Sequence, residues 1–311
     1  VVEPYKETTL VVLGAVDGVT YQWSVGGSDY VGLTPTMEFI TINERTTVEL
    51  RELDPSGNVL RKANGQLITK YVRRELRSLD KEDLTAFLDA METLYRVPAN
   101  PLKYGDEYRD AFDFVALHNE LAGGRECDHA HDGLGFLTIH TALSMQFEQS
   151  LQTVDPSVSL PFWDYTIEAA RVRAAGDITA FYSSEVFDPD LLGGFPDLDE
   201  GEEYVLKEGR WAYLPMSPKS WPGDAASVTN GYGLMRSPWN QNPSPFLSRS
   251  SKMYGAEFDK VPSCDMHFDQ MQLKDWASFG QKIQYKPHGS MHTVLAGGWG
   301  IDYYSLFLEM G

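Results

Sequence analysis

The sequence has few cysteines and no long apolar run. Two cysteines, Cys127 and Cys264, stand among 311 residues; they permit one disulfide and exclude a disulfide-rich scaffold or a four-cysteine zinc site. The longest apolar run, near residues 10–16, is far shorter than the roughly 20 residues of a membrane-spanning helix. We therefore expect no membrane span. The sequence begins at Val1 without a methionine or a leader, which favours a secreted or organellar protein whose leader has been removed.

Basic residues are also scarce. Lys and Arg total 26 against 45 Asp and Glu, which gives a formal net charge of −19. Nucleic acid and anionic membranes would be repelled, so neither is an expected partner, whereas small neutral molecules such as phenols are not excluded. The acidic stretch at 188–203 contains interleaved glycines and predicts a solvated loop.

The first 66 residues have the pattern of short strands. Apolar and polar residues alternate in 9–13, 21–25 and 47–53, and glycine-containing turns separate these runs. The spacing predicts a small antiparallel β-sandwich as a separate N-terminal domain, residues 1–66. It contains no histidine, so a metal site is expected in the remaining domain, residues 67–311.

The period changes to that of helices after about residue 70. Asp80 can cap an amphipathic helix whose apolar residues run from Leu84 to Tyr95. Further helices are predicted over about 107–121 and from near His140 to Leu151. Between 155 and 281 the chain is rich in Pro, Gly, Ser and Trp, which is typical of long loops that wrap a core.

Most of the seven histidines fall in clusters. His131 and His140 lie nine positions apart, and His288 and His292 lie four apart. Two imidazoles at the latter spacing point from one helix face toward one ion, and imidazole suits copper, zinc, iron and nickel. His118 lies on an apolar helix face, where a lone histidine usually packs in the core. The neighbouring histidine clusters favour a ligand role for it instead.

The segments around these histidines resemble known copper proteins. Their order matches the first copper-binding half of the tyrosinase and catechol oxidase family, which has a Phe-Leu-Pro-Trp-His run, a Phe-Glu-x-x-Leu helix and a Pro-Tyr-Trp-Asp turn. Weaker similarities lie at 70–79, 238–243 and 287–292, so the resemblance covers roughly 70–311. The matching segments of the first half are 114–119, 131–140, 147–152 and 160–165.

This resemblance implies a mainly α-helical copper-binding bundle with long loops, preceded here by the β-sandwich. It implies that His118, His131 and His140 hold one copper and that His288 and His292 are two ligands of a second. The implied activity is that of a type 3 copper oxidase, which oxidises o-diphenols, and in some members phenols, to o-quinones with dioxygen. Side chains that could orient the ligands are Asn119, Asp132 and Asp164.

The sequence departs from the family pattern at the second copper. A third histidine is expected well after His292, but residues 293–311 contain none; we expect that the chain is incomplete, the alternative being that this ligand is missing. Gly289 stands where the family often has Asn. An upstream Glu that positions a water is not evident, Gln281 and Gln284 being the nearest polar residues. These differences favour diphenol oxidation over monophenol hydroxylation.

Three further residues have alternative roles. His129 could replace His131 as a ligand, but it lies eleven positions before His140, so we expect a non-ligand role. Cys127 has either a disulfide with Cys264 or a free thiol, the family's cysteine–histidine thioether being less favoured because its usual two-residue spacing reaches His129. His267 is expected to be structural, with replacement of the missing ligand as the alternative.

Other functions remain compatible with these residues. The chain could be a catalytically silent extracellular protein that keeps the fold with an incomplete second copper site and binds a protein partner through the β-domain. An oxygen carrier would need the same ligands in a shielded site. A zinc hydrolase is disfavoured, because Gly289 stands where the metalloprotease motif has its Glu base.

Overall fold

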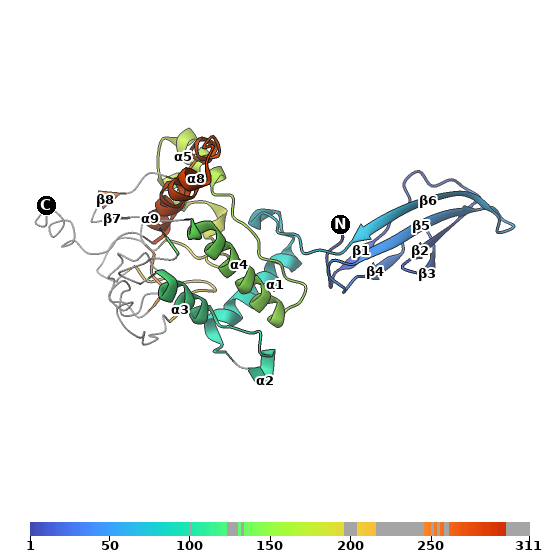
Figure 1. Cartoon of the computed structure of the whole chain (residues 1–311), viewed down its shortest axis with the longest axis horizontal. Coiled ribbons are helices and arrows are strands. Elements are labelled where there is room, and N and C mark those ends of the chain that lie inside the picture. Colours follow the sequence, from blue (N-terminus) through green and yellow to red (C-terminus); the bar gives the residue numbers. More distant parts are fainter. Residues whose placement is uncertain are drawn as a thin grey trace, which may run out of the picture.

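The computed structural model divides the protein into two parts (Figure 1). A β-domain, residues 1–69, projects from a larger helical body, residues 70–296. None of the described helices combines the length and apolar character needed to cross a lipid bilayer. The described residues are 1–99, 101–122, 130–131, 134–195, 204–215, 246–249, 252–253, 256–257 and 261–296.

The β-domain contains two antiparallel sheets. The larger has the strand order β3-β2-β5-β6, and the smaller pairs β1 with β4. Buried Trp23 and Val25 of β2 and Val48 of β5 form one apolar cluster with residues of the smaller sheet such as Met37. This confirms the antiparallel strands predicted at 21–25 and 47–53, whereas of the run at 9–13 only Thr9 belongs to a strand. The strands are β1 Glu7–Thr9, β2 Thr20–Val25, β3 Ser28–Val31, β4 Thr36–Glu38, β5 Arg45–Leu53 and β6 Val59–Ile68.

The turn between β2 and β3 follows directly from its two glycines. Val25 pairs with Ser28, so Gly26 and Gly27 form a two-residue loop, and both have positive φ, 58° and 90°. Such a loop needs left-handed backbone at both positions, which glycine adopts without steric cost.

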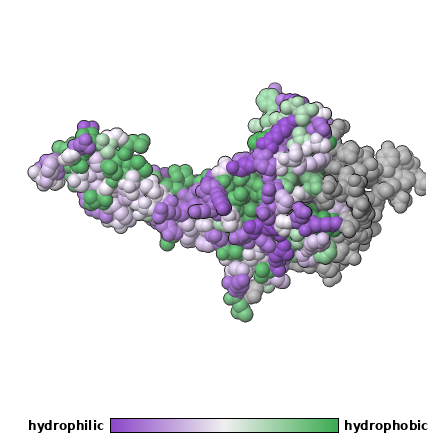
Figure 2. All heavy atoms as spheres, turned by 180° about the vertical axis from the view of Figure 1, so that it is seen from behind, coloured by the Kyte–Doolittle hydropathy of each residue, from purple (hydrophilic) through white to green (hydrophobic). Residues whose placement is uncertain are grey.

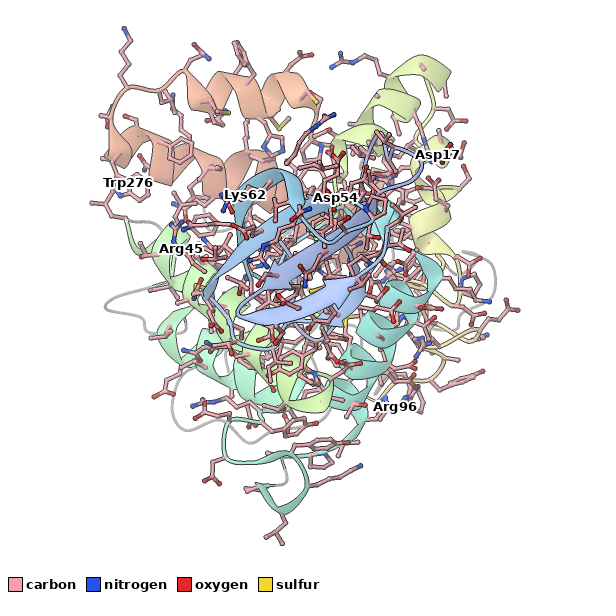
Figure 3. All side chains as sticks on the ribbon, turned by 90° about the vertical axis from the view of Figure 1, so that its right-hand side faces the viewer. Asp17, Arg45, Asp54, Lys62, Arg96 and Trp276 are labelled. Atoms are coloured by element: carbon pink, nitrogen blue, oxygen red, sulfur yellow. The ribbon has the colours of Figure 1, made fainter. Side chains whose placement is uncertain are left out.

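The surface of the β-domain is partly apolar. Leu13 is 89% exposed, Val31 70% and Ile40 59%, and the rear view shows green patches on this domain (Figure 2). In the view along the long axis, charged Arg45 and Lys62 lie on the domain in front of the helical body (Figure 3).

The chain enters and leaves the β-domain at one joint. The Val2 N–H donates to the Ile68 carbonyl at 3.0 Å, and the Lys70 N–H donates to the Val2 carbonyl at 2.9 Å. Lys6 Nζ lies 2.7 Å from Asp83 Oδ1 at the start of α1. Backbone pairing and an ion pair therefore hold the two parts together.

The helical body packs around one apolar core. Leu94 of α1, Leu151 of α4, Phe181 of α6 and Val294 of α9 are fully buried within it. Its elements are η1 Leu76–Ser78, α1 Lys81–Arg96, α2 Pro101–Tyr104, α3 Ala111–Ala122, α4 Gly135–Val154, α5 Thr166–Ala175, α6 Thr179–Tyr182, η2 Glu185–Phe187, β7 Lys252–Met253, β8 Ala256–Glu257, α7 Cys264–Met271, α8 Trp276–Ile283, the π-helix η4 Gln284–Gly289, and α9 Ser290–Ala296.

The predicted helix starts are partly right. Asp80 caps α1 as expected, its side chain accepting from the Asp83 N–H at 2.8 Å. The second helix begins at Ala111 rather than 107, because Asp110 Oδ1 accepts from the Phe112 N–H at 2.9 Å and so satisfies a donor of its first turn. The third begins at Gly135, five residues before the expected His140. The predicted loop region, 155–281, also contains α5, α6, α7 and most of α8, which its composition did not indicate.

A buried carboxylate ties the 160–165 segment to α5. Glu168 is fully buried and pairs with Arg77 at 2.5 Å. It also accepts from Trp163 Nε1 at 2.9 Å and from Ser184 Oγ at 2.8 Å. Because its oxygens have charged and neutral donors, the cost of burying the charge is offset. This network braces the entry segment before α1 against the body.

Candidate metal centre

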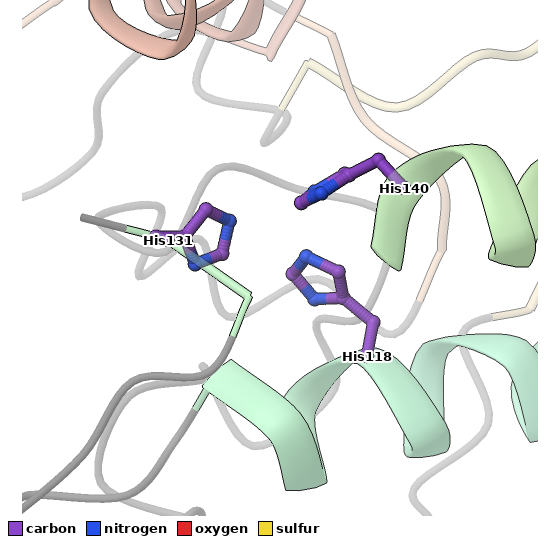
Figure 4. Close-up of side chains that lie close together, drawn as sticks. All are labelled: His118, His131 and His140. Atoms are coloured by element: carbon purple, nitrogen blue, oxygen red, sulfur yellow. The ribbon is translucent and has the colours of Figure 1, made fainter. Parts of the chain in front are cut away.

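Three histidines from separate segments converge (Figure 4). His118 lies on α3, His140 lies on α4, and His131 lies in the connection before α4. Their ring centroids are 5.1 Å (His118–His131), 5.2 Å (His118–His140) and 5.3 Å (His131–His140) apart. One ligand nitrogen of each ring lies within 4.8 Å of the others. We call these residues the first histidine set.

The second histidine set comes from a single turn. His288 lies in η4 and His292 one turn later in α9. Their Nε2 atoms are 2.9 Å apart, and the His288 ring centroid is 5.8 Å from that of His140. The two sets are therefore neighbours, although 148 positions separate these last two residues in the 311-residue sequence.

Backbone carbonyls fix the tautomers of two rings. His140 Nδ1 lies 2.8 Å from the Phe136 carbonyl, and His288 Nδ1 lies 3.0 Å from the Gln284 carbonyl. A carbonyl only accepts, so each Nδ1 carries the proton and each Nε2 keeps its lone pair. Donation from one ring nitrogen while the other ligates is the usual arrangement of metal-bound histidine.

The second set is held in the neutral form. The pKa of His292 is lowered to about 4, mainly by burial, and repulsion between its protonated ring and a protonated ring of His288 or His118 acts in the same direction. Its ring nevertheless keeps contact with solvent. The pKa of His288 is also lowered, mainly by burial, although its bond to Gln284 opposes the change. Neutral imidazole is the form that binds a metal.

The geometry fits metal ions at both sets. Two imidazole nitrogens that bind one ion at about 2.0–2.1 Å and at a right angle are about 2.9 Å apart, which is the separation of the two Nε2 atoms of the second set. Three tetrahedral ligands at that bond length lie roughly 3.4 Å apart. The three nitrogens of the first set lie within 4.8 Å of one another, which is the same scale as this spacing.

Comparison with known proteins identifies the family. The model of the common central domain of tyrosinase matches residues 108–307, more than half of the chain. The chain belongs to the tyrosinase family. A tyrosinase-like protein of Pinctada maxima is 30% identical over 77% of this chain and 47% of its own length. A tyrosinase of Streptomyces antibioticus is 29% identical over 45% of this chain and 46% of its own.

The chain spans less than half of the length of these relatives. A tyrosinase of Aspergillus oryzae, 27% identical, matches 48% of this chain over 30% of its own length. The family model begins at residue 108, so the whole β-domain and α1 lie outside the matched central domain. Family membership supports copper as the metal that the two histidine sets would hold.

Other residues of the family resemblance brace the centre. Glu148 of the Phe-Glu-x-x-Leu segment accepts from the Leu160 N–H at 2.8 Å and pairs with Arg73 at 2.7 Å. The carboxylate of Asp164, expected among the groups that orient ligands, instead accepts from Thr166 Oγ1 at 2.6 Å. The Pro-Phe-Trp-Asp turn is thus bound to α4 and to the start of α5.

The remaining candidates differ in what the structure describes. His267 packs its ring against Tyr165 with centroids 5.5 Å apart, which favours the structural role expected for it. Cys264 is exposed and has a free thiol. The disulfide with Cys127 that the sequence allowed is therefore not formed. Cys127, His129, Asp132 and the side chain of Asn119 lie outside the described residues.

Sequence reasoning missed the groups that orient the rings. Both acceptors are backbone carbonyls four residues before a histidine, at Phe136 and Gln284. The helical i−4 spacing was the available signal. The identities of the side chains do not reveal these acceptors, because any residue type supplies a backbone carbonyl.

Proposed function

We propose that the protein is a type 3 copper oxidase that oxidises o-diphenols to o-quinones with dioxygen. The observation that carries this proposal is the approach of the two histidine sets. The ring centroids of His140 and His288 lie 5.8 Å apart. A small phenolic substrate and dioxygen would be the reactants. Two coppers bound there would supply the electrons for reducing dioxygen and would recover them from the diphenol.

In this proposal each histidine has a defined task. His118, His131 and His140 hold one copper, and His288 and His292 are two ligands of the other. The Nδ1–H bonds of His140 and His288 to backbone carbonyls, 2.8 and 3.0 Å, hold the proton away from the metal-binding nitrogen. The ligating nitrogen therefore needs no deprotonation before the ion binds.

The preference for diphenols follows from what is absent around Gly289. A monophenol must lose its phenolic proton, and a general base is commonly worth about 10² to 10⁴ in rate. Gly289 has no side chain to hold a water, and the amides of Gln281 and Gln284 are not bases. We expect much slower initial oxidation of tyrosine than of dihydroxyphenylalanine. Efficient tyrosine hydroxylation would contradict this preference.

Copper content measured together with oxygen uptake tests the proposal. If a third second-site histidine lies beyond Gly311, the purified protein that includes it, reconstituted with copper(I) and exposed to air, is expected to retain about two coppers and to consume oxygen on addition of catechol. The His267→Ala variant is the matched control, because it removes a histidine that packs on Tyr165. One copper or less per chain, with no oxygen uptake, would refute the proposal.

A second candidate is a catalytically silent protein that keeps this fold. The observation that favours it is the exposed apolar surface of the β-domain, including Leu13 at 89% and Val31 at 70%. Such a surface is typical of interaction with a protein partner. This candidate predicts one copper or less per chain and no oxygen uptake with catechol, with an intact fold by circular dichroism.

Two further expectations belong to this proposal. We propose that the β-domain and the copper-binding domain are separate folding units divided near residue 66, which limited proteolysis and N-terminal sequencing would test.

We also propose a secreted or extracellular location, or an organelle lumen. Immunoblotting of fractions from the source organism would test it, and recovery in the cytosolic fraction would refute it.

A further inference from the structure

The ring of Phe136 contacts histidines of both sets. Phe136 is the second residue of α4 and only 5% exposed. Its ring centroid lies 4.4 Å from that of His140 and 4.9 Å from that of His288. A third distance, 6.2 Å, separates it from His131. One apolar side chain therefore borders ligands that come from distant parts of the sequence.

Phe136 holds His140 in two independent ways. Its carbonyl accepts from His140 Nδ1 at 2.8 Å, which fixes the tautomer. Its ring meets the imidazole at an interplanar angle of 46°, which restricts rotation of that imidazole about its side-chain bonds. The backbone bond survives any substitution at this position, whereas the ring contact does not. The two contributions can thus be separated by mutation.

The contact with His288 has a different geometry. The Phe136 and His288 rings meet edge to face, at 62°, an arrangement that aromatic pairs prefer over a face-to-face stack. His288 and His140 themselves meet at 72°. The three rings therefore restrict one another, and the orientation of a second-set ligand depends on a side chain of α4.

We propose that Phe136 is a positioning residue for both histidine sets, its ring forming a shared wall that sets the angle of His140 and of His288 and hence the spacing of the two metal ions. The inference rests on the proposed dicopper function. It has a specific consequence: removing the ring perturbs both metal sites, whereas a defect in one set perturbs one.

A copper titration of three proteins tests this consequence. We compare wild type, Phe136→Leu and Phe87→Leu, since Phe87 is also 5% exposed but lies in the central apolar core. Loss of a group that orients ligands typically costs about 10- to 100-fold in metal affinity. We expect losses of that order in both binding steps of Phe136→Leu and in neither step of Phe87→Leu. Weakening of one step alone, or of both variants equally, would overturn the proposal.

The metal-free protein gives a readout independent of copper. In ¹⁵N NMR spectra of the histidine side chains, wild type is expected to show the Nδ1–H tautomer at His140 and His288. Phe136→Leu and Phe87→Leu should keep these tautomers, because both acceptors are backbone carbonyls. The nuclear Overhauser contacts between the His140 and His288 rings should weaken in Phe136→Leu and persist in Phe87→Leu. Unchanged ring contacts in Phe136→Leu would refute the shared wall. Phe136→Met, which fills more of the space without a flat ring, serves if the Leu variant does not fold.

Failure of the function and failure of the positioning role are distinguishable. A wild type that binds one copper or less and consumes no oxygen with catechol refutes the proposed function, and the ring contacts of the metal-free protein then still decide the role of Phe136. A wild type that binds two coppers, with a Phe136→Leu variant that binds them equally well, refutes only the positioning role.

Discussion

The two histidine sets are built in different ways. The first set joins His118 of α3, His140 of α4 and His131 from the connection between them. The second set needs one turn of chain, from His288 to His292. The first set therefore depends on how two helices pack, and the second on the local geometry of η4 and α9. Changes that loosen helix packing should affect the first set, and changes confined to the turn should affect the second.

The largest effect is expected from His140→Ala, which removes a ligand of the first set. We expect loss of that copper, loss of catechol oxidation, and a fall in unfolding free energy of about 1 kcal/mol, because a half-buried side chain next to Phe136 is lost. Copper analysis and urea unfolding measure these effects. Two coppers retained in the variant would remove His140 from the set.

The neighbouring histidines sharpen the composition of the first set. His131→Ala is expected to lose copper as His140→Ala does, because the two rings lie 5.3 Å apart. His129→Ala, which changes the expected non-ligand, should leave copper content nearly intact. The opposite result for these two variants would show that the ligand is the earlier histidine.

A smaller effect on the first set is expected from Ser150→Ala. The fully buried Ser150 of α4 donates to the Arg109 carbonyl at 2.7 Å and accepts from its N–H at 2.9 Å, which ties the segment before α3 to α4. Leaving buried polar groups unpaired costs about 1–3 kcal/mol. We expect weaker binding of the first copper and unchanged binding of the second. Equal weakening of both would show that the sets are not independent of this tie.

The control for Ser150→Ala is Thr85→Val on α1. Its hydroxyl bonds only back within its own helix, to the Lys81 carbonyl at 2.7 Å, and the residue is exposed. Thermal unfolding and copper titration of both variants separate a lost tie between elements from the loss of any hydroxyl group.

The second set should respond to Gly289→Ala. A Cβ at this position would lie 3.3 Å from the Gln284 carbonyl oxygen, the atom that accepts from His288 Nδ1. Displacing that acceptor should weaken the second copper by about 10-fold and spare the first. Gly280→Ala is the control, because its Cβ would meet Leu134 at an ordinary 3.9 Å. Equal affinities in both variants would contradict this dependence on the turn.

The same crowding affects a substitution suggested by the family pattern. Gly289→Asn would supply the amide expected to orient a water and raise the monophenol-to-diphenol ratio. It would also bring a Cβ to 3.3 Å from the Gln284 carbonyl. The monophenol-to-diphenol ratio of Gly289→Asn should therefore be compared with that of Gly289→Ala, which introduces the same Cβ contact without the amide.

The smallest effect is expected from pH on the metal-free protein. The pKa of His292 is about 4 in the folded state, mainly through burial, against about 6.5 for an unperturbed histidine. Between these values the unfolded chain binds more protons, so stability should fall as the pH decreases from 6.5 toward 4. The melting temperature should decrease less for His292→Gln than for wild type between pH 7.5 and 5.5. Equal decreases would show that His292 does not contribute.

The sequence predicted those features that depend on local chemistry. Asp80 was expected to cap α1 and does so, and the alternation around Trp23 correctly indicated a strand. The order β3-β2-β5-β6 was not predictable, because strand pairing depends on which faces meet in the folded domain. For the same reason, the spacing of His131 and His140 indicated ligands but gave no sign of the Phe136 ring between them and His288.

The joint at Val2 brings the two ends of the β-domain together. Val2 forms a parallel bridge with Thr69, so both ends of the β-domain lie at its junction with the helical body. In engineering terms these two ends are close enough for a short linker to replace residues 3–68. A tag fused at Val1, which is 74% exposed, would accordingly be attached beside the helical body and far from the tip of the β-domain (Figure 1).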